Sequence, residues 1–142
     1  MIKLLRYIVT TDEINTATGE IKLFLLKNPS TSKHLFVEKI LISSQDAGQK
    51  TFKIYRNPTI TTNGTALTIN KVRATQSASI ATAFLSPTIS ANGTLLFGGN
   101  FGEGSPLQLL DIPFVVEPSE DILITTQSTS DRIFLTIVWI EE

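Results

Sequence analysis

Apolar and polar residues alternate with a period of two along most of the chain. In the last such stretch Ile133, Leu135 and Trp139 share one face, whereas Arg132 and Thr136 fall on the other. This alternation places one face of a strand in a core and the other towards water. Further strand-like stretches lie at 21–26, 35–41, 52–56, 65–69, 80–84, 95–97 and 122–124, and 107–116 is a longer apolar run broken by Pro113. No segment keeps the helical i, i+3, i+4, i+7 spacing for three turns, so the pattern predicts strands throughout.

Turn-forming residues separate these stretches. They are Pro29, Asn63-Gly64, Asn92-Gly93, Gly98-Gly99, Gly102, Gly104 and Pro118. Short strands at regular spacing indicate a sandwich or a barrel, and a jelly roll of two four-stranded sheets suits a chain of 142 residues. We therefore expect an all-β, jelly-roll-like antiparallel β-sandwich of about eight to ten strands, with residues 20–142 forming a single domain.

The first nineteen residues differ from the rest of the chain. An apolar, strand-like piece at 2–9 is followed by a polar, weakly patterned segment at 10–19. An apolar strand followed by a polar hinge is typical of an arm. Such an arm can pair with the sheet edge of a neighbouring subunit. An ordinary first strand followed by a long loop explains the same pattern, so both interpretations stay open. If residues 1–19 are an arm, their deletion should leave a folded domain that no longer attaches to its lattice.

A ten-residue segment occurs twice, at 58–67 and at 87–96. The two copies are identical at seven of ten positions, with an offset of 29 residues. Proline ends the preceding strand because it cannot donate to a ladder, and Asn-Gly favours positive φ and a tight turn. Each copy therefore predicts a strand, an extended loop and a return strand. The loops are either two similar turns at one end of the sandwich or a joint contact surface that includes Asn63, Gly64, Asn92 and Gly93.

Composition and charge narrow the classes of function. The net charge is −1, and basic residues are scattered from Lys3 to Arg132, whereas nucleic-acid-binding proteins concentrate Lys and Arg on one face. Attachment to an anionic membrane is disfavoured for the same reason. The N-terminus lacks the features of a signal peptide, and no apolar run has the length of a transmembrane helix, so we expect synthesis in the cytoplasm. Low net charge in a small domain favours assembly into an oligomer or a lattice.

Residues with catalytic chemistry are few. The chain has no cysteine, and its one histidine, His34, completes no recognisable triad. A single histidine cannot by itself hold a transition metal. The acids Asp12-Glu13, Glu120-Asp121 and Glu141-Glu142 are adjacent pairs. In a strand such neighbours point to opposite faces, so these pairs form no acid-base couple by spacing alone. We therefore expect no enzyme activity, no metal site and no cofactor.

Several residues are candidates for contact with a partner. The Gly-rich segment 98–104 is either a mobile loop or a loop that orders on a partner with Phe101 as its anchor. Trp139 and Tyr55 are of the type that stacks on sugar rings, although a Trp in a terminal apolar strand is more often a core residue. The candidate interaction surface comprises Ile2, Leu4, Tyr7, Ile8, Asn63, Gly64, Asn92, Gly93 and Phe101.

Four features together resemble a known family. They are the segments 27–30, 52–59 and 116–125 and the two Asn-Gly-Thr turns, within a match that covers 23–140. In these features the chain resembles small jelly-roll structural proteins encoded among the virion genes of tailed bacteriophages. The resemblance implies a virion component without catalysis, so there are no active-site residues to transfer.

The resemblance also implies a role and partners. Head decoration proteins, head fibres and tail or baseplate attachments use such domains, commonly as trimers. The N-terminal segment and the compact single domain favour a capsid decoration protein, which binds between capsid subunits and stabilises the shell. Its partners would be further copies of the chain, in a homotrimer, and the major capsid protein or another virion protein. The alternative is a tail or fibre module that binds a receptor or a carbohydrate.

Overall fold

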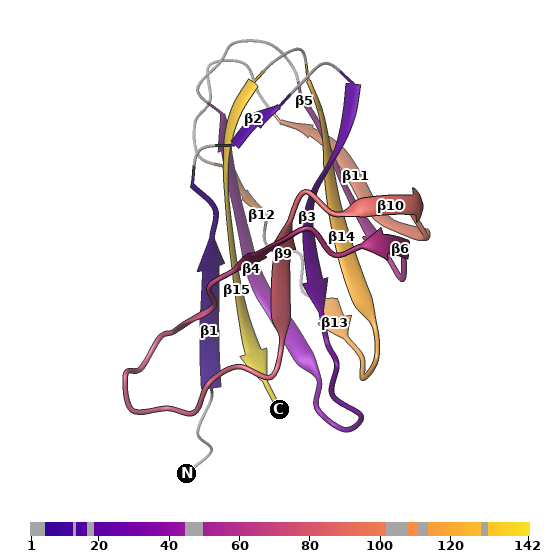
Figure 1. Cartoon of the computed structure of the whole chain (residues 1–142). Helices are drawn as coiled ribbons and strands as arrows, with labels where there is room; N and C mark the ends of the chain where they lie inside the picture. The colour runs from indigo at the N-terminus through magenta and orange to yellow at the C-terminus, as the bar shows by residue number, and fades with distance from the viewer. Residues whose placement is uncertain are drawn as a thin grey trace.

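The computed structural model describes residues 5–12, 14–16, 19–44, 50–101, 108–110, 114–128 and 131–142. Over these residues the chain is an all-β antiparallel sandwich (Figure 1), as the sequence predicts. The strands are β1 (Leu5–Thr10), β2 (Ile14–Thr16), β3 (Gly19–Lys27), β4 (Leu35–Ser44), β5 (Lys50–Arg56), β6 (Thr59–Thr62), β7 (Thr65–Leu67), β8 (Asn70–Lys71), β9 (Thr82–Leu85), β10 (Thr88–Ala91), β11 (Thr94–Phe101), β12 (Gln108–Leu110), β13 (Phe114–Val116), β14 (Asp121–Ser128) and β15 (Asp131–Glu141). The described part thus has fifteen strands, more than the eight to ten expected, because several are very short.

Two sheets form the sandwich. The seven-stranded sheet has the order β12-β4-β15-β1-β8, with β13 beside β4 and β2 beside β15, and the six-stranded sheet has the order β11-β5-β14-β3-β9-β7. The first long strand pairs with the last, β1 with β15, and the next pairs inward are β3 with β14, β4 with β12 and β13, and β5 with β11. This is the pairing of one long hairpin rolled into two sheets, which is a jelly roll.

The hydrophobic core lies between the two sheets. On β15 alternate residues from Ile133 to Trp139 are at most 2% exposed, as the period-two pattern predicts. The largest buried rings are those of Tyr7 and Trp139, which stack with their centroids 6.2 Å apart. Burial of each large apolar side chain contributes roughly 1.5–3 kcal/mol. The core therefore depends on β1 as well as on the strands predicted from the domain proper.

The N-terminal strand belongs to the chain's own sheet. β1 pairs with β15 along its whole length, from Leu5 opposite Glu141 to Thr10 opposite Thr136. The side chain of Tyr7 is fully buried in the core, in place of the surface position expected from the sequence. Ile8 is partly exposed, while Ile2 and Leu4 lie outside the described residues.

Deletion of residues 1–19 tests this position of β1. The truncation would remove Tyr7 and Val9 from the core, so we expect it to lose cooperative thermal unfolding rather than to leave a folded domain. Deletion of residues 1–4 is the control, because it keeps β1 and should keep the transition. Calorimetry of both truncations distinguishes the outcomes, and a folded 1–19 truncation would contradict a core role for this strand.

The two copies of the repeated segment follow β5 and β9 and pair with each other. β6 and β10 form a two-stranded ribbon in which Ile60 stands opposite Ile89. The return strands are exchanged, since β7, which follows β6, pairs with β9, whereas β11, which follows β10, pairs with β5. The repeat does give a strand, a loop and a return strand in each copy, but each return strand pairs with the strand that precedes the other copy.

This exchange gives the six-stranded sheet an approximate internal two-fold symmetry. Asn57 and Ser86 each precede the proline of their copy and have φ of 53° and 54°. The Asn57 amide donates to the carbonyl of Asp121 at 2.8 Å, and the Ser86 amide donates to that of Leu23 at 3.0 Å. Corresponding backbone groups therefore make corresponding contacts at the two ends of the ribbon.

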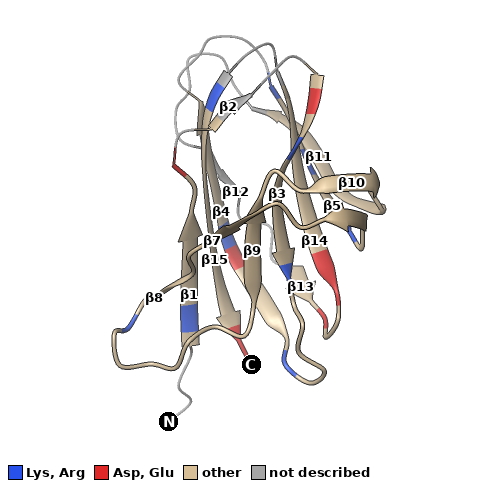
Figure 2. Ribbon diagram, in the orientation of Figure 1, with Lys and Arg blue, Asp and Glu red and all other residues tan. Residues whose placement is uncertain are grey.

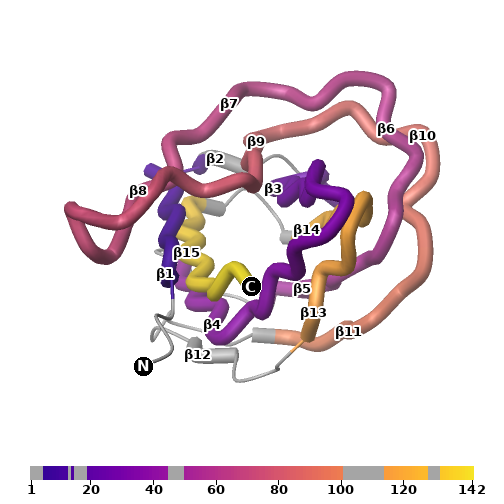
Figure 3. The backbone as a smooth tube through the Cα atoms, turned by 90° about the horizontal axis from the view of Figure 1, so that it is seen from below, coloured from indigo at the N-terminus to yellow at the C-terminus, as the bar shows by residue number. Residues whose placement is uncertain are grey.

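The ribbon makes a third layer on the six-stranded sheet. Figure 3 shows β6 and β10 outside that sheet, on the side away from the seven-stranded sheet. Leu25 and Leu123 in the central strands are fully buried, yet they stand outside the core cluster between the two sheets. Strands buried on both faces read as continuous apolar runs, which explains why 23–26 is apolar at every position.

Gly64 and Gly93 permit the close crossing of the two copies. Their φ angles are 94° and 89°. A Cβ at Gly93 would lie 2.7 Å from the carbonyl oxygen of Asn57, and one at Gly64 would lie 2.9 Å from that of Ser86. Both the backbone conformation and the space therefore require glycine.

Substitution of Gly93 should be costly for that reason. We expect Gly93→Ala to lower the free energy of unfolding by on the order of 2 kcal/mol. Gly98→Ala is the matched control, because its Cβ would meet only the Lys53 side chain, at 3.7 Å. Urea denaturation of the two variants measures the difference, and equal stabilities would contradict the close crossing.

Candidate interaction surface

The described residues hold no group of three or more His, Cys, Asp or Glu side chains that could bind a metal ion. Nε2 of His34 lies 2.8 Å from an Oε2 of Glu117, and both side chains are partly exposed. The His34 amide and carbonyl also pair with the backbone of Glu142. His34 therefore ties the start of β4 to the segment after β13 and to the C-terminus.

Charged residues are dispersed over the molecule. Figure 2 shows Lys, Arg, Asp and Glu at separate places, and β6, β9 and β10 carry none of them. Burial raises the pKa of the Asp121 carboxyl, Lys27 partly offsets this rise, and Glu120 adds to it. The backbone amide of Asp121 donates to the side-chain oxygen of Asn57 at 3.1 Å, so Asp121 lies at the turn that leads into the ribbon.

No helix in the described parts of the chain is long and apolar enough to cross a membrane.

The Asn-Gly pairs fasten the two ends of the ribbon to the sheet. Lys27 Nζ donates to Oδ1 of Asn63 at 3.1 Å, and Nδ2 of Asn92 donates to Glu20 at 3.3 Å. Each pair lies at one end of the ribbon, beside the backbone that immediately precedes the other copy. The four residues Asn63, Gly64, Asn92 and Gly93 are thus not gathered into one patch, and their contacts hold the third layer in place.

The aromatic candidates of the sequence are placed by the structure as follows, and Trp139 is the core residue that its apolar strand favours. Trp139 is fully buried and Tyr55 is 9% exposed, so neither ring is available to stack on a sugar. Phe101 is the last residue of β11, where it stands opposite Lys50. Gly98 and Gly99 also belong to β11 rather than to a loop, and 102–104 lie outside the described residues.

One edge of the six-stranded sheet is apolar and uncharged. β11 pairs with β5 on one side, and in the described part of the chain no strand covers its other side. Leu95 and Leu96 are 53% and 37% exposed, and with Val72 they are the exposed large hydrophobic residues among those described. Edge strands are normally protected by charge or proline, but 94–101 contains neither. That uncharged run was the sequence signal for an exposed edge, although its position at an edge depends on the exchanged pairing.

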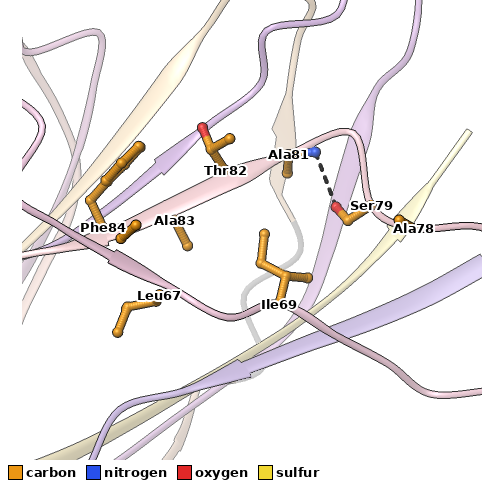
Figure 4. A pocket seen from close by; sticks show the side chains of 9 residues that line it. Leu67, Ile69, Ala78, Ser79, Ala81, Thr82, Ala83 and Phe84 are labelled. Atoms are coloured by element: carbon orange, nitrogen blue, oxygen red, sulfur yellow. Dashed lines mark hydrogen bonds between the residues drawn. The ribbon is translucent and has the colours of Figure 1, made fainter.

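An apolar pocket lies at the opposite end of the same sheet. β7 leaves β9 after Leu67, and the two backbone segments diverge like a fork (Figure 4). The space between them is about 220 Å³, below the roughly 300–1,000 Å³ of small-molecule sites. Its lining carries no charged side chain and consists of Ala66, Leu67, Ile69, Ala78, Ser79, Ala81, Thr82, Ala83 and Phe84.

The internal symmetry explains why this pocket exists. With the offset of 29 residues, Ala81 and Ala83 correspond to Phe52 and Ile54 in the other half of the sheet. Phe52 and Ile54 are at most 2% exposed and fill the core at their end. Two alanines in the place of these larger side chains leave the space unfilled. Sequence reasoning missed the pocket because the correspondence extends beyond the ten residues that are visibly repeated.

A buried carboxylate holds the segment that leads into β9, which forms one side of the pocket. Glu141 is 3% exposed and accepts hydrogen bonds from Trp139 Nε1 at 3.2 Å, from the Ile80 amide at 3.2 Å and from the Ser79 hydroxyl. The Tyr7 hydroxyl donates to the carbonyl of Ser77 at 2.8 Å. These bonds fix one wall of the pocket against the core.

Removal of this carboxylate should destabilise the fold. Glu141→Ala leaves buried donors without an acceptor, so we expect a loss of about 2–4 kcal/mol in the free energy of unfolding. Glu142→Ala is the control, because the neighbouring side chain is exposed. Chemical denaturation compares the two variants, and a loss below about 0.5 kcal/mol for Glu141→Ala would refute the fastening role.

No protein-family model matches the chain, and no curated protein matches it.

Proposed function

We propose that this chain is a structural protein of a bacteriophage virion, and specifically a capsid decoration protein that binds between capsid subunits and stabilises the shell. The resemblance of the sequence to small jelly-roll virion proteins suggests this role. The observation that supports it best is the exposed, uncharged edge strand β11 with Leu95 and Leu96.

An edge of this kind is unfavourable in an isolated chain and favourable in an assembly. Burial of a leucine contributes roughly 1.5–3 kcal/mol, and the unpaired backbone groups of an edge strand are a template for a further strand. The net charge of −1 opposes association only weakly. The gain from covering the edge is therefore large, and the electrostatic cost is small.

The mass in solution is the first test. Size exclusion with light scattering should give a homotrimer, three times the chain mass of 15.6 kDa. A trimer supports the proposal, and a monomer that stays monomeric at high concentration counts against it.

Attachment to the shell is the second test. The purified protein should co-sediment with capsids that lack auxiliary proteins and should raise the temperature at which they release DNA. Failure to bind, together with a specific signal on a glycan array, would replace this proposal by a tail or fibre module that binds carbohydrate. Trp139 and Tyr55, the two aromatic residues considered for sugar stacking, are buried, so neither supports that alternative.

A further inference from the structure

We infer that the chain self-associates head to tail, with Leu95 and Leu96 of one copy seated in the β7–β9 pocket of the next. The two leucines are here called the knob, and the pocket lined by Ala66, Leu67, Ile69, Ala78, Ser79, Ala81, Thr82, Ala83 and Phe84 is called the socket. This inference rests on the proposed function for the number of copies and deepens it by naming the surfaces that join them.

The knob is a local irregularity of the edge strand. The register of β11 against β5 shifts between Leu95 and Phe97, so Leu96 is the extra residue of a β-bulge. Bulges bend an edge strand and redirect its side chains. The result is two adjacent leucines that are both exposed at one end of the six-stranded sheet.

The socket has the size and polarity for this knob. A cavity of about 150 Å³ lined by apolar residues holds a benzene ring, so a pocket of about 220 Å³ accommodates branched aliphatic side chains. The described socket residues and the whole of β11 carry no charge. Docking would therefore bury apolar surface without desolvating an ion.

Knob and socket occupy opposite ends of one sheet, which decides the kind of contact. By the offset of 29 residues, Leu95 and Leu96 correspond to Ala66 and Leu67 in the socket wall. On the outer face Leu95 stands beside Tyr55, and Ala66 stands beside Phe84. A second copy placed at the socket would continue this apolar row from one sheet to the next.

A contact between two different surfaces is heterologous. It generates a closed ring when the rotation between copies closes and a filament when it does not. A three-membered ring is the closed form that agrees with the proposed trimer. A two-fold contact between equal edges would instead bury the same surface twice.

Three sets of variants test each surface separately. Leu95→Ser with Leu96→Ser removes the knob, and Ala66→Glu places a charge on an exposed residue of the socket. Val72→Ser is the matched control, because Val72 is as exposed as Leu95 and belongs to neither surface. Light scattering should give monomers for the knob and socket variants and the unchanged oligomer for the control. An oligomer that survives both changes would overturn the inference.

A second socket variant guards against a folding defect. Ala83→Ile introduces the residue found at the corresponding position 54 and fills the socket from within. It should keep or raise the melting temperature and still abolish the oligomer. An Ala83→Ile protein that is stable and oligomeric would also overturn the inference.

A mixture of two variants distinguishes head-to-tail from two-fold association. The knob variant keeps its socket, and the Ala66→Glu variant keeps its knob, so one intact contact remains between them. An equimolar mixture should form a heterodimer of twice the chain mass and nothing larger. If the mixture stays monomeric, the contact is not heterologous.

The same experiments separate this inference from the proposed function. A wild-type monomer that still binds capsids would overturn the head-to-tail contact and leave the decoration role intact. A trimer that responds to the variants as expected, but does not bind capsids, would support the contact and count against the decoration role.

Discussion

The reciprocal crossing of two backbone segments at Gly64 and Gly93 is the constraint on which the outer half of the structure depends. Each glycine lies so close to the backbone just before the other copy that a Cβ would clash, and each has the positive φ that glycine tolerates. The crossing sends β7 to β9 and β11 to β5. It therefore determines which strands end the six-stranded sheet and which surface remains uncovered.

The inner half depends on the pairing of the chain's two ends. β1 and β15 lie side by side in the seven-stranded sheet, and the stacked rings of Tyr7 and Trp139 fill the core between the sheets. Glu141 accepts the indole N–H of Trp139 and holds the segment before β9. A buried carboxylate is tolerated there because several donors compensate its lost hydration. Glu141 thus ties the segment that leads into β9 to the last strand.

The chemistry available to this protein lies at the two ends of the six-stranded sheet. Leu25 and Leu123 in its central strands are fully buried, so they are not accessible to a partner. The exposed leucines at one end and the uncharged pocket at the other follow from an approximate symmetry that is broken by side-chain size. Ala81 and Ala83 take the places that Phe52 and Ile54 fill in the other half. This asymmetry is the physical basis for proposing assembly as the function.

The sequence by itself determined the elements, and the tertiary structure decided their partners. Alternation from Ile133 to Trp139 and the turns at Gly64 and Gly93 are local properties, set by side-chain direction and allowed φ, so they could be predicted. Whether β1 joins its own sheet, and which strand receives β7, depends on contacts between residues far apart in the chain. Such pairings are chosen by burial over the whole fold, which no local pattern encodes. For this reason Tyr7 proved to be a core residue, and the exposure of Leu95 became visible only in the folded chain.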